Sequence, residues 1–443
     1  MSAESRATFF RQSGWVAFAT VLGGVFLTAV HMVASSQAGM AEAEYSVFVT
    51  LLRIQLLISI PAAGLQAMFA RQAAAAINDT EKRELAATLR RVIFCIVLLW
   101  LASLVGLAVL QTFSSDFFQR WHIKNPAGVW LTFTVGLGFI LLSVLRGVLT
   151  GRQDFWGLGW TFAIDGIVRF AAIAVAMKLG HQAAGGMVAV FFGLLVTNAL
   201  AAWWLRDLSW RAAAPMDWKP WLRRAIPLAI GPGVMVFMFS ADVLFVQTTF
   251  AKGQTHFYMP AATVGMALFM FLTPMAIVMF PKLVSSKAEG GNSRALQHAL
   301  TGTALLGGLA VATLLLFPKL PLWVLYFKNP VYWKSAPLVA WYIAALFPLL
   351  LANVLIGNLL AKERLGPLPC VLMLLLATGY AATLWSQRVP LLEMATVATV
   401  DKSILSAGSQ HAFQRVIQIF GGFNLAILAL AAGLSWHLKA RDN

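Results

Sequence analysis

The sequence predicts an all-α integral membrane protein in which about twelve transmembrane helices form two six-helix lobes related as parallel repeats. Three observations lead to this fold class: composition, the distribution of basic residues and an internal repeat. Only 11% of the 443 residues are charged whereas 60% are hydrophobic, and the mean hydropathy is +0.77. A soluble chain carries about 25% charged residues. Most of this surface must therefore face lipid.

Twelve apolar stretches, each close to the roughly 20 residues that cross a bilayer as a helix, divide the chain. The first follows Arg6 and Arg11, but it is longer than the apolar core of a signal peptide, so we interpret it as a membrane helix. The predicted spans are Trp15–Ser36, Tyr45–Ala70, Val92–Phe113, Val129–Thr150, Leu158–Met177, Gly186–Leu205, Ala225–Phe250, Phe257–Phe280, Ala299–Phe317, Ala336–Leu360, Leu368–Trp385 and Phe413–Trp436.

Basic residues alternate between the loops in the way that the positive-inside rule requires. If the N-terminus is cytoplasmic, the inside segments hold twenty Lys and Arg and the outside segments nine. An odd number of spans would scramble this pattern. We therefore expect an inner-membrane protein with both termini in the cytoplasm.

An internal repeat predicts the two lobes. Tyr45 precedes Pro61 by sixteen residues, and Tyr258 precedes Pro274 by the same number. The tripeptide Lys-Asn-Pro occurs at 124–126 and again at 328–330, in both cases in an outside loop. Equivalent elements are six spans apart, so the halves have the same orientation. The predicted organisation is an N-terminal lobe at 1–205, a basic cytoplasmic linker at 206–224 and a C-terminal lobe at 225–443.

Several function classes lack support in the sequence. The net charge is +16, but the basic residues lie in short groups between apolar runs and do not form one basic stripe, so no nucleic-acid partner is predicted. Cys95 and Cys370 lie inside apolar runs, and the seven histidines show no ligand spacing, so neither a metal nor a cofactor is expected. No phosphate-binding loop or hydrolase motif occurs, and no enzyme is predicted.

Charged residues inside predicted spans are the candidates for function, because an arginine at the centre of a membrane helix costs about 2.5–3.5 kcal/mol on insertion scales. In the N-terminal lobe Arg53, Arg146 and Arg169 lie inside predicted spans, together with one nearby acid, Asp165. We predict that the three arginines line a hydrated cationic cleft and hold an anionic, phosphate-bearing substrate, since a guanidinium grips phosphate oxygens bidentately.

Each of these residues also has a structural interpretation. Asp165 and Arg169 are four positions apart on one helix face and could neutralise each other. Arg146 is close enough to the inner end of its span to extend its guanidinium to the surface. Arg53 has no partner within its own helix.

A second set of residues concerns coupling and bending. Asp242 in the seventh span could bind a proton or an ion, or could hydrogen-bond a neighbouring helix. Pro61, Pro227, Pro232 and Pro274 mark kinks, and bent helices beside a lobe boundary provide hinges. We expect Pro227 and Pro232, with the glycines beside them, to break or bend the start of the seventh span.

Several stretches resemble the polysaccharide-export branch of the multidrug/oligosaccharidyl-lipid/polysaccharide (MOP) transporter superfamily. In the first half they are Gly39–Phe48, Pro61–Ala67 and Leu145–Phe155, and in the second half Ser240–Val246 followed by Tyr258–Ala262. With the parallel halves and the basic linker, the resemblance covers nearly the whole chain.

This resemblance implies a flippase that alternates between inward- and outward-facing states. The implied substrate is an undecaprenyl diphosphate-linked oligosaccharide for surface polysaccharide, O-antigen or exopolysaccharide, with H⁺ or Na⁺ and glycan polymerase or export proteins as further partners besides membrane lipid. Arg53, Arg146 and Arg169 are the positions that match a cationic cavity. Three alternatives stay open: a cation-coupled multidrug exporter of the same superfamily, an integral-membrane glycan polymerase or ligase, and a non-transporting scaffold in a glycan export complex.

Overall fold

The computed structural model describes residues 3–113, 121–209, 218–270, 294–361, 365–395 and 405–440. All regular structure in these ranges is helical, as predicted. Within the described ranges, nine helices are long and apolar enough to cross a membrane, and a tenth span is formed if the bent pair α2 and α3 is counted as one. Two further predicted spans overlap the shorter apolar helices Met259–Met270 and Leu300–Leu316, and residues 271–280 of the predicted span Phe257–Phe280 lie outside the described ranges. Each of the twelve predicted spans therefore corresponds to a helix in the described part of the chain.

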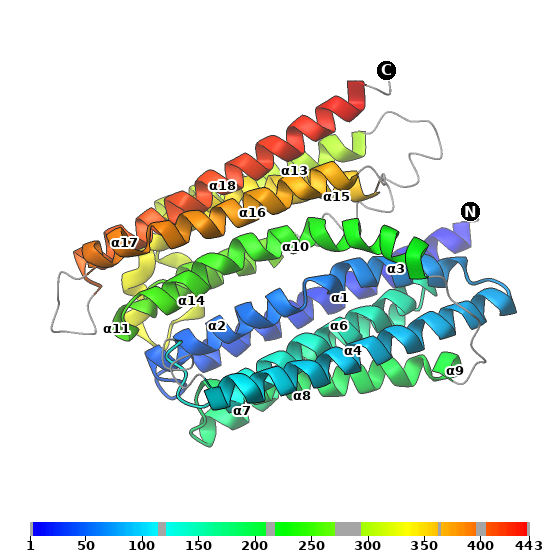
Figure 1. The fold of residues 1–443 in the computed structure, drawn as a ribbon, viewed down its shortest axis with the longest axis horizontal. Helices are drawn as coiled ribbons and strands as arrows, with labels where there is room; N and C mark the ends of the chain where they lie inside the picture. Colours follow the sequence, from blue (N-terminus) through cyan, green and yellow to red (C-terminus); the bar gives the residue numbers. More distant parts are fainter. Residues whose placement is uncertain are drawn as a thin grey trace. The chain divides into compact units, whose positions relative to one another are not determined.

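Figure 1 labels the helices and colours them in chain order. Those of the first half are α1 (Ala3–Ala34), α2 (Glu42–Ile58), α3 (Pro61–Ala75), α4 (Asp79–Phe113), α6 (Ala127–Gly151), α7 (Phe155–Lys178), α8 (Ala183–Trp204) and α9 (Arg206–Ser209). Those of the second half are α10 (Trp218–Thr249), α11 (Lys252–Thr255), α13 (Arg294–Leu316), α14 (Leu320–Leu325), the 3₁₀ helix η1 (Pro330–Ser335), α15 (Ala336–Ala361), α16 (Pro367–Ser386), α17 (Arg388–Ala395) and α18 (Ala407–Ala440).

The chain divides into two compact units. Unit 1 comprises Met1–Ala34, Ala38–Ala41 and Ile54–Ala229, and unit 2 comprises Ser35–Gln37, Glu42–Arg53 and Ile230–Asn443. These units differ from the predicted lobes in two places. The outer part of α2 belongs to unit 2, and unit 1 continues to Ala229 in α10. Contacts in space, rather than order along the chain, decide this division. The lobe boundaries themselves stay a prediction.

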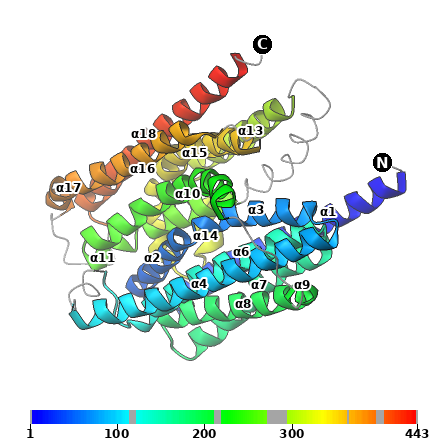
Figure 2. The ribbon, with the colours of Figure 1, turned by 45° about the vertical axis from the view of Figure 1, so that its right-hand side comes forward.

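Unit 1 is a bundle in which α7 packs on α1 and α8, and α6 packs on α3 and α8. Figure 2 shows α4, α6, α7 and α8 side by side, as Figure 1 does. Gly147 and Gly151 make the close approach of α6 to α3 possible. A Cβ at Gly147 would lie 2.5 Å from the Gln66 carbonyl oxygen, and one at Gly151 would lie 2.3 Å from that of Ala70. Their spacing of four residues is typical of such helix contacts.

Unit 2 contains a second bundle in which α15 packs on α13 and α18, and α16 packs on α18. Asn424 of α18 donates a hydrogen bond from Nδ2 to the carbonyl oxygen of Ala345 in α15 at 2.8 Å. Within a membrane the hydrophobic effect does not drive helices together, because lipid chains are as apolar as the side chains. Interhelical hydrogen bonds of this kind therefore help to hold the helices together.

The two Lys-Asn-Pro sequences form the same local structure. Asn125 accepts a hydrogen bond at Oδ1 from the backbone N–H of Ala127 at 3.0 Å, directly before α6. Asn329 accepts the equivalent bond from the N–H of Val331 at 3.3 Å, at the start of η1 and α15. Both asparagines therefore make the side-chain turn that starts a helix. This agreement supports the internal repeat.

The predicted kinks have different outcomes. The chain bends by 44° between α2 and α3, where Pro61 is the first residue of α3. Pro227 and Pro232, by contrast, lie within the continuous helix α10, so the helix is not broken there, while a bend at these prolines stays a prediction. Membrane helices tolerate proline where neighbouring groups satisfy the freed carbonyls. Pro274 lies outside the described residues.

Candidate functional site

Arg146 of α6 is buried against α7 in unit 1. Its Nε donates to Thr161 Oγ1 and its Nη2 to the Thr161 carbonyl oxygen, both at 2.9 Å. The guanidinium also lies 4.0 Å from the centre of the Phe162 ring. Only 5% of the residue is exposed. The interpretation that Arg146 extends to the surface is therefore wrong, because its Nε and Nη2 donate to Thr161 inside the bundle.

Asp165 and Arg169 form a buried ion pair on α7. Arg169 Nε donates to Asp165 Oδ1 at 2.8 Å, across one helical turn. Arg169 Nη2 is buried and has no hydrogen-bond partner among the described residues. Gly193 of α8 provides the space for this side chain, since a Cβ there would lie 2.3 Å from Arg169 Cγ. Gly193 was not recognised in the sequence, because only the packing of α7 on α8 gives it this role.

Arg146, Asp165 and Arg169 interact electrostatically with one another. We call these three residues the α6–α7 charge cluster. With two arginines and one aspartate, the cluster carries a net charge of +1. A buried positive charge with an unused N–H donor is suited to binding an anionic oxygen, because both charge and donor would otherwise stay unsatisfied.

Arg53 is held separately, within unit 2. Its Nη2 donates to the carbonyl oxygen of Ala262 at 2.8 Å, its Nη1 lies 2.9 Å from Met266 Sδ, and its guanidinium is 5.5 Å from the centre of the Phe239 ring. The residue is 2% exposed. Arg53 was expected to share an N-terminal lobe with Arg146 and Arg169. The structure instead assigns it to the unit built from the second half of the chain, since its contacts are with α10 and the Met259–Met270 helix.

Asp242 of α10 accepts a hydrogen bond at Oδ2 from the Tyr258 hydroxyl at 2.7 Å. Tyr342 and Tyr380 interact with it electrostatically, as does Arg53. Tyr258 lies in the turn directly before the Met259–Met270 helix, so this bond does not join Asp242 to a neighbouring helix itself. The role of Asp242 in binding a proton or an ion stays a prediction. The surrounding tyrosines were missed as site residues, although Tyr258 belongs to the repeat.

The outer part of α2 carries further polar contacts within unit 2. The hydroxyls of Tyr45 and Tyr326 are 2.9 Å apart, and the Tyr45 ring packs edge-on against Tyr332 at 5.5 Å between ring centres. Ser46 Oγ donates to Gln247 Oε1 at 2.5 Å. The side chains of Tyr45, Ser46, Tyr326 and Tyr332 are all fully buried. These contacts, like those of Arg53, attach α2 to elements more than 200 residues later.

His256 lies beside this aromatic group, between α11 and the Met259–Met270 helix. It is 4% exposed, its ring is 4.0 Å from that of Phe257, and Nε2 has no hydrogen-bond partner in the described ranges. Burial lowers the pKa of His256 to about 4, with Lys334 lowering it further and Glu42 opposing the shift. The imidazole is therefore neutral in the folded protein at neutral pH.

We expect the protein to lose stability as the pH falls from about 6.5 to about 4. In this window the unfolded chain protonates His256 near its ordinary pKa of about 6.5, whereas the folded chain does not, so protons favour unfolding. At about 1.4 kcal/mol per pKa unit, the loss is up to roughly 3 kcal/mol. The measurement is the unfolding midpoint in detergent from pH 7.5 to 4 for the wild type and His256→Gln. The variant should show a clearly shallower decline, and equal slopes would contradict the assignment.

No group of three or more His, Cys, Asp or Glu that could hold a metal ion occurs in the part of the chain that the structure describes.

Comparison with known proteins gives structural matches only. No family model matches the chain, and no curated protein does. A multidrug resistance MATE family transporter of the MOP superfamily, in an inward-facing conformation, superposes with a TM-score of 0.64 at 14% identity, over 92% of this chain and 95% of that one. A MOP superfamily transporter from Pyrococcus furiosus, described as having a binding pocket of reverse polarity, gives 0.62 at 11% identity, over 97% and 94%.

The lipid II flippase MurJ in an inward closed conformation gives a TM-score of 0.63 at 11% identity, over 97% of this chain and 87% of that one. These matches extend over nearly the full length of the chain, so the correspondence concerns the whole helical arrangement. Taken with the apolar helices, they show that this multi-pass membrane protein has the fold of MATE transporters of the MOP superfamily and of the lipid II flippase MurJ.

Proposed function

We propose that the chain is a transporter that flips a polyprenyl (undecaprenyl) diphosphate-linked oligosaccharide across the bacterial inner membrane by alternating access, for surface polysaccharide or lipopolysaccharide synthesis. The fold that it shares with MATE transporters and with a lipid II flippase supports a transport function. The resemblance of Gly39–Phe48 and Leu145–Phe155 to the polysaccharide-export branch supports this substrate class.

The observation that carries the proposal is the net positive α6–α7 charge cluster. Arg146 and Arg169 are buried in membrane helices with only one carboxylate between them, and Arg169 Nη2 has no partner among the described residues. A diphosphate is too costly to transfer through hydrocarbon without compensation. Guanidinium groups at membrane depth would lower that barrier while the polyprenyl tail stays in lipid.

Direction would come from an ion gradient, the membrane potential or consumption of the product, since the sequence contains no ATPase motif. Asp242 and Asp165 are the buried carboxylates that we assign to coupling with H⁺ or Na⁺. Asp242 is the stronger candidate, because Asp165 is already neutralised by Arg169 while Asp242 has a hydroxyl partner. Pro61, at the 44° bend, is the hinge candidate with the clearest geometry.

The test begins with deletion of the gene in its native bacterium, followed by assays of surface polysaccharide and of the undecaprenyl diphosphate-linked oligosaccharide. We expect the surface glycan to be lost and the lipid-linked unit to accumulate on the cytoplasmic face. Repeat units that accumulate on the outer face would identify a polymerase or ligase instead. Complementation with Arg146→Gln should restore export at least tenfold less well than the wild type, the factor expected when about 1.5–3 kcal/mol of charge-assisted hydrogen bonding is lost.

The control is Arg152→Gln. Arg152 forms an exposed ion pair with Asp207 and should complement fully. Normal export by Arg146→Gln at wild-type protein level would refute the cationic-cleft mechanism.

A cation-coupled multidrug exporter is the second candidate, because a MATE multidrug transporter is among the structural matches. For such a cargo the buried acids, and not the arginines, would have to contact the substrate. Deletion would then leave both glycan pools unchanged and alter drug tolerance. In that case complementation with Asp242→Asn would fail to restore drug tolerance, whereas complementation with Arg146→Gln would restore it.

A further inference from the structure

The connection between α13 and α15 is rich in aliphatic and aromatic residues. It runs from Phe317 to Ser335, contains α14 and η1, and holds three lysines and no acidic residue. α14 has six residues and is therefore about 9 Å long, too short to cross a bilayer. The ninth predicted span ends where this connection begins, and the tenth begins where it ends. We therefore place α14 at one boundary of the membrane, the outer one according to the positive-inside pattern.

Four apolar side chains form an exposed stripe along this connection. Leu320 is 45%, Trp323 51% and Val324 59% exposed, and their spacing is that of a single helix face. Phe327, in the turn after α14, is 49% exposed and extends the stripe. We call these four residues the α14 stripe. In a soluble protein the apolar stripe of a short surface helix faces the core, whereas here it is exposed.

The opposite face of the connection is fastened inside unit 2. Leu322 and Tyr326 are buried. The Tyr326 hydroxyl lies 2.9 Å from that of Tyr45, and Trp333 donates from Nε1 to the Tyr326 carbonyl oxygen at 3.2 Å. Because this face is already occupied, the stripe cannot be hidden by rotation of α14. Its exposure is thus a consequence of the packing and calls for a partner outside unit 2.

The stripe is continuous along the chain with surfaces that contact lipid. Leu315 and Leu316, at the end of α13, are 58% and 74% exposed, and Trp341 near the start of α15 is 49% exposed. α15 belongs to a helical stretch long and apolar enough to span the membrane, and α13 contains a shorter apolar helix. Exposed apolar side chains on membrane helices contact lipid chains. The surface on either side of the stripe is therefore a lipid surface.

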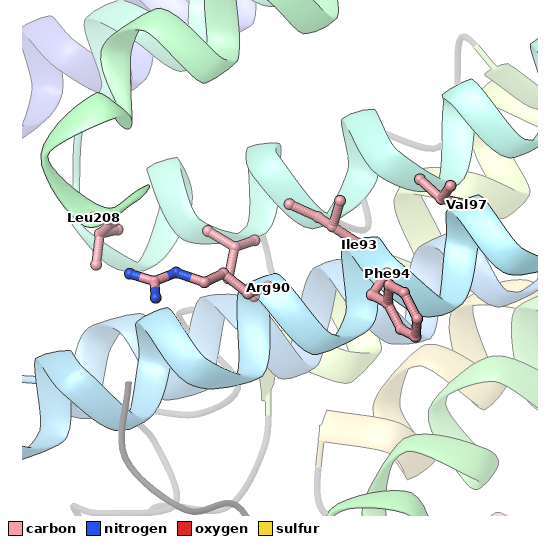
Figure 3. A pocket seen from close by; sticks show the side chains of 6 residues that line it. Arg90, Ile93, Phe94, Val97 and Leu208 are labelled. Carbon is pink, nitrogen blue, oxygen red and sulfur yellow. The ribbon is translucent and has the colours of Figure 1, made fainter. Parts of the chain in front are cut away.

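The exposure of the stripe matches that of a spanning helix in unit 1. α4 is long and apolar enough to cross the membrane, and it exposes Phe94 by 62% and Val97 by 45%. Figure 3 shows both side chains on α4, where they line a groove together with Leu208. On a spanning helix such side chains lie against lipid chains. The α14 stripe has apolar side chains of the same kind, exposed to the same extent.

Tryptophan and lysine, two residue types common at membrane interfaces, accompany the stripe. The Trp323 ring packs edge-on against Trp333 at 6.4 Å between ring centres, and Lys328 Nζ lies 5.4 Å from the centre of the Phe327 ring. Lys319 and Lys328 are exposed next to the two ends of the stripe. A lysine can keep its aliphatic part on apolar surface while its ammonium group reaches the headgroups. Apolar area bordered by basic residues is typical of a helix that lies in the interface.

We propose that the α14 stripe docks into the interface of the lipid bilayer, with α14 parallel to the membrane plane. The stripe enters the boundary between headgroups and acyl chains by about 5–10 Å. The docked leaflet is the one that the positive-inside pattern predicts as the outer leaflet. The connection between α13 and α15 is thus an interfacial anchor rather than a loop in water. This inference does not depend on the transport function.

The experiment measures the depth of a fluorescent nitrobenzoxadiazole label on Val324→Cys in the full-length protein, reconstituted in liposomes of phosphatidylethanolamine and phosphatidylglycerol. Cys95→Ala and Cys370→Ala first remove the native thiols. Lipids with a nitroxide high or low on the acyl chain quench the label according to its depth, and iodide quenches it from water. We expect the strongest quenching from the high nitroxide and little from iodide.

Two matched labels calibrate the depth. Leu309→Cys lies on α13 at a residue that is 64% exposed, seven positions before the end of the helix, so it should be about 10 Å deeper and be quenched most by the low nitroxide. Ile77→Cys lies at a residue that is 81% exposed in the turn between α3 and α4 and should be quenched by iodide.

A double variant then tests the stripe itself. Trp323→Ser with Phe327→Ser should shift the Val324→Cys label toward water by about 5–10 Å, the full depth of docking. Leu309→Ser, an equally exposed change outside the stripe, should leave the label where it is. The Leu309→Cys label should keep its depth in the double variant, which guards against misfolding.

Three outcomes would overturn the proposal. Iodide quenching of the Val324→Cys label as strong as that of Ile77→Cys would make the stripe a water-exposed surface for another protein. Protection from both iodide and nitroxides would indicate a second copy of the chain on the stripe. An unchanged depth in the double variant would show that the stripe does not hold α14 at the interface.

Discussion

Replacing Asp165 with alanine should lower the free energy of unfolding by about 3–5 kcal/mol, because it leaves the buried Arg169 without its counterion. The pair is joined by one hydrogen bond of 2.8 Å, and both side chains are less than 10% exposed. Arg146 would then face a second uncompensated positive charge in the same bundle. The measurement is SDS-induced unfolding in mixed micelles without substrate.

The double variant Asp165→Leu with Arg169→Met distinguishes structure from function. Removing both charges in favour of apolar side chains of similar size often costs little or stabilises a protein, so most of the lost stability should return. Transport should nevertheless stay absent if Arg169 contacts the substrate. A stable double variant with normal transport would make the pair purely structural. A single variant as stable as the wild type would contradict the ion pair.

Replacing Arg53 with methionine should also cost about 3–5 kcal/mol in the absence of any substrate. The change removes a charge-assisted hydrogen bond to the Ala262 carbonyl, worth about 1.5–3 kcal/mol, and a desolvated cation–π contact with Phe239, worth about 2 kcal/mol. The free energy of unfolding of Arg53→Lys should lie between those of the wild type and Arg53→Met, because lysine keeps the charge but not the planar guanidinium. Unfolding is measured as for Asp165.

The same variants decide between two roles for Arg53. If the arginine mainly attaches α2 to unit 2, stability falls without substrate, and Asp242→Asn shows a coupling energy with Arg53→Met of about 0.5–3 kcal/mol in a double-mutant cycle. If Arg53 instead binds substrate, as its depth in the span predicts, Arg53→Met would be as stable as the wild type and only transport would fall. The surface variant Arg152→Gln serves as the neutral control.

The fold followed from the sequence because lipid is a simple solvent. A helix in a bilayer must be apolar and about 20 residues long, so composition and length identify it without reference to its neighbours. Each of the twelve predicted stretches overlaps a helix of the described residues, the second as the bent pair α2 and α3 and the eighth only up to Met270. The repeated Lys-Asn-Pro is similarly local, since each asparagine needs only the backbone two residues later. The ion pair of Asp165 and Arg169 was also within reach, because one helical turn joins them.

Partners across helices were beyond the sequence, because helix packing decides them. Nothing near Arg53 in the chain indicates that it bonds to Ala262, or that the outer part of α2 belongs with the second half of the chain. The position of Arg146 in the sequence is equally consistent with a guanidinium that reaches the membrane surface. Only the packing of α7 against α6 shows that the guanidinium bonds to Thr161 instead. Pro227 and Pro232 look like a break, yet α10 continues through them. The sequence by itself thus determined which residues enter the membrane and with what charge, since that depends on transfer from water to lipid. Tertiary structure alone decided which of those charges meet, since that depends on contacts between segments far apart in the chain.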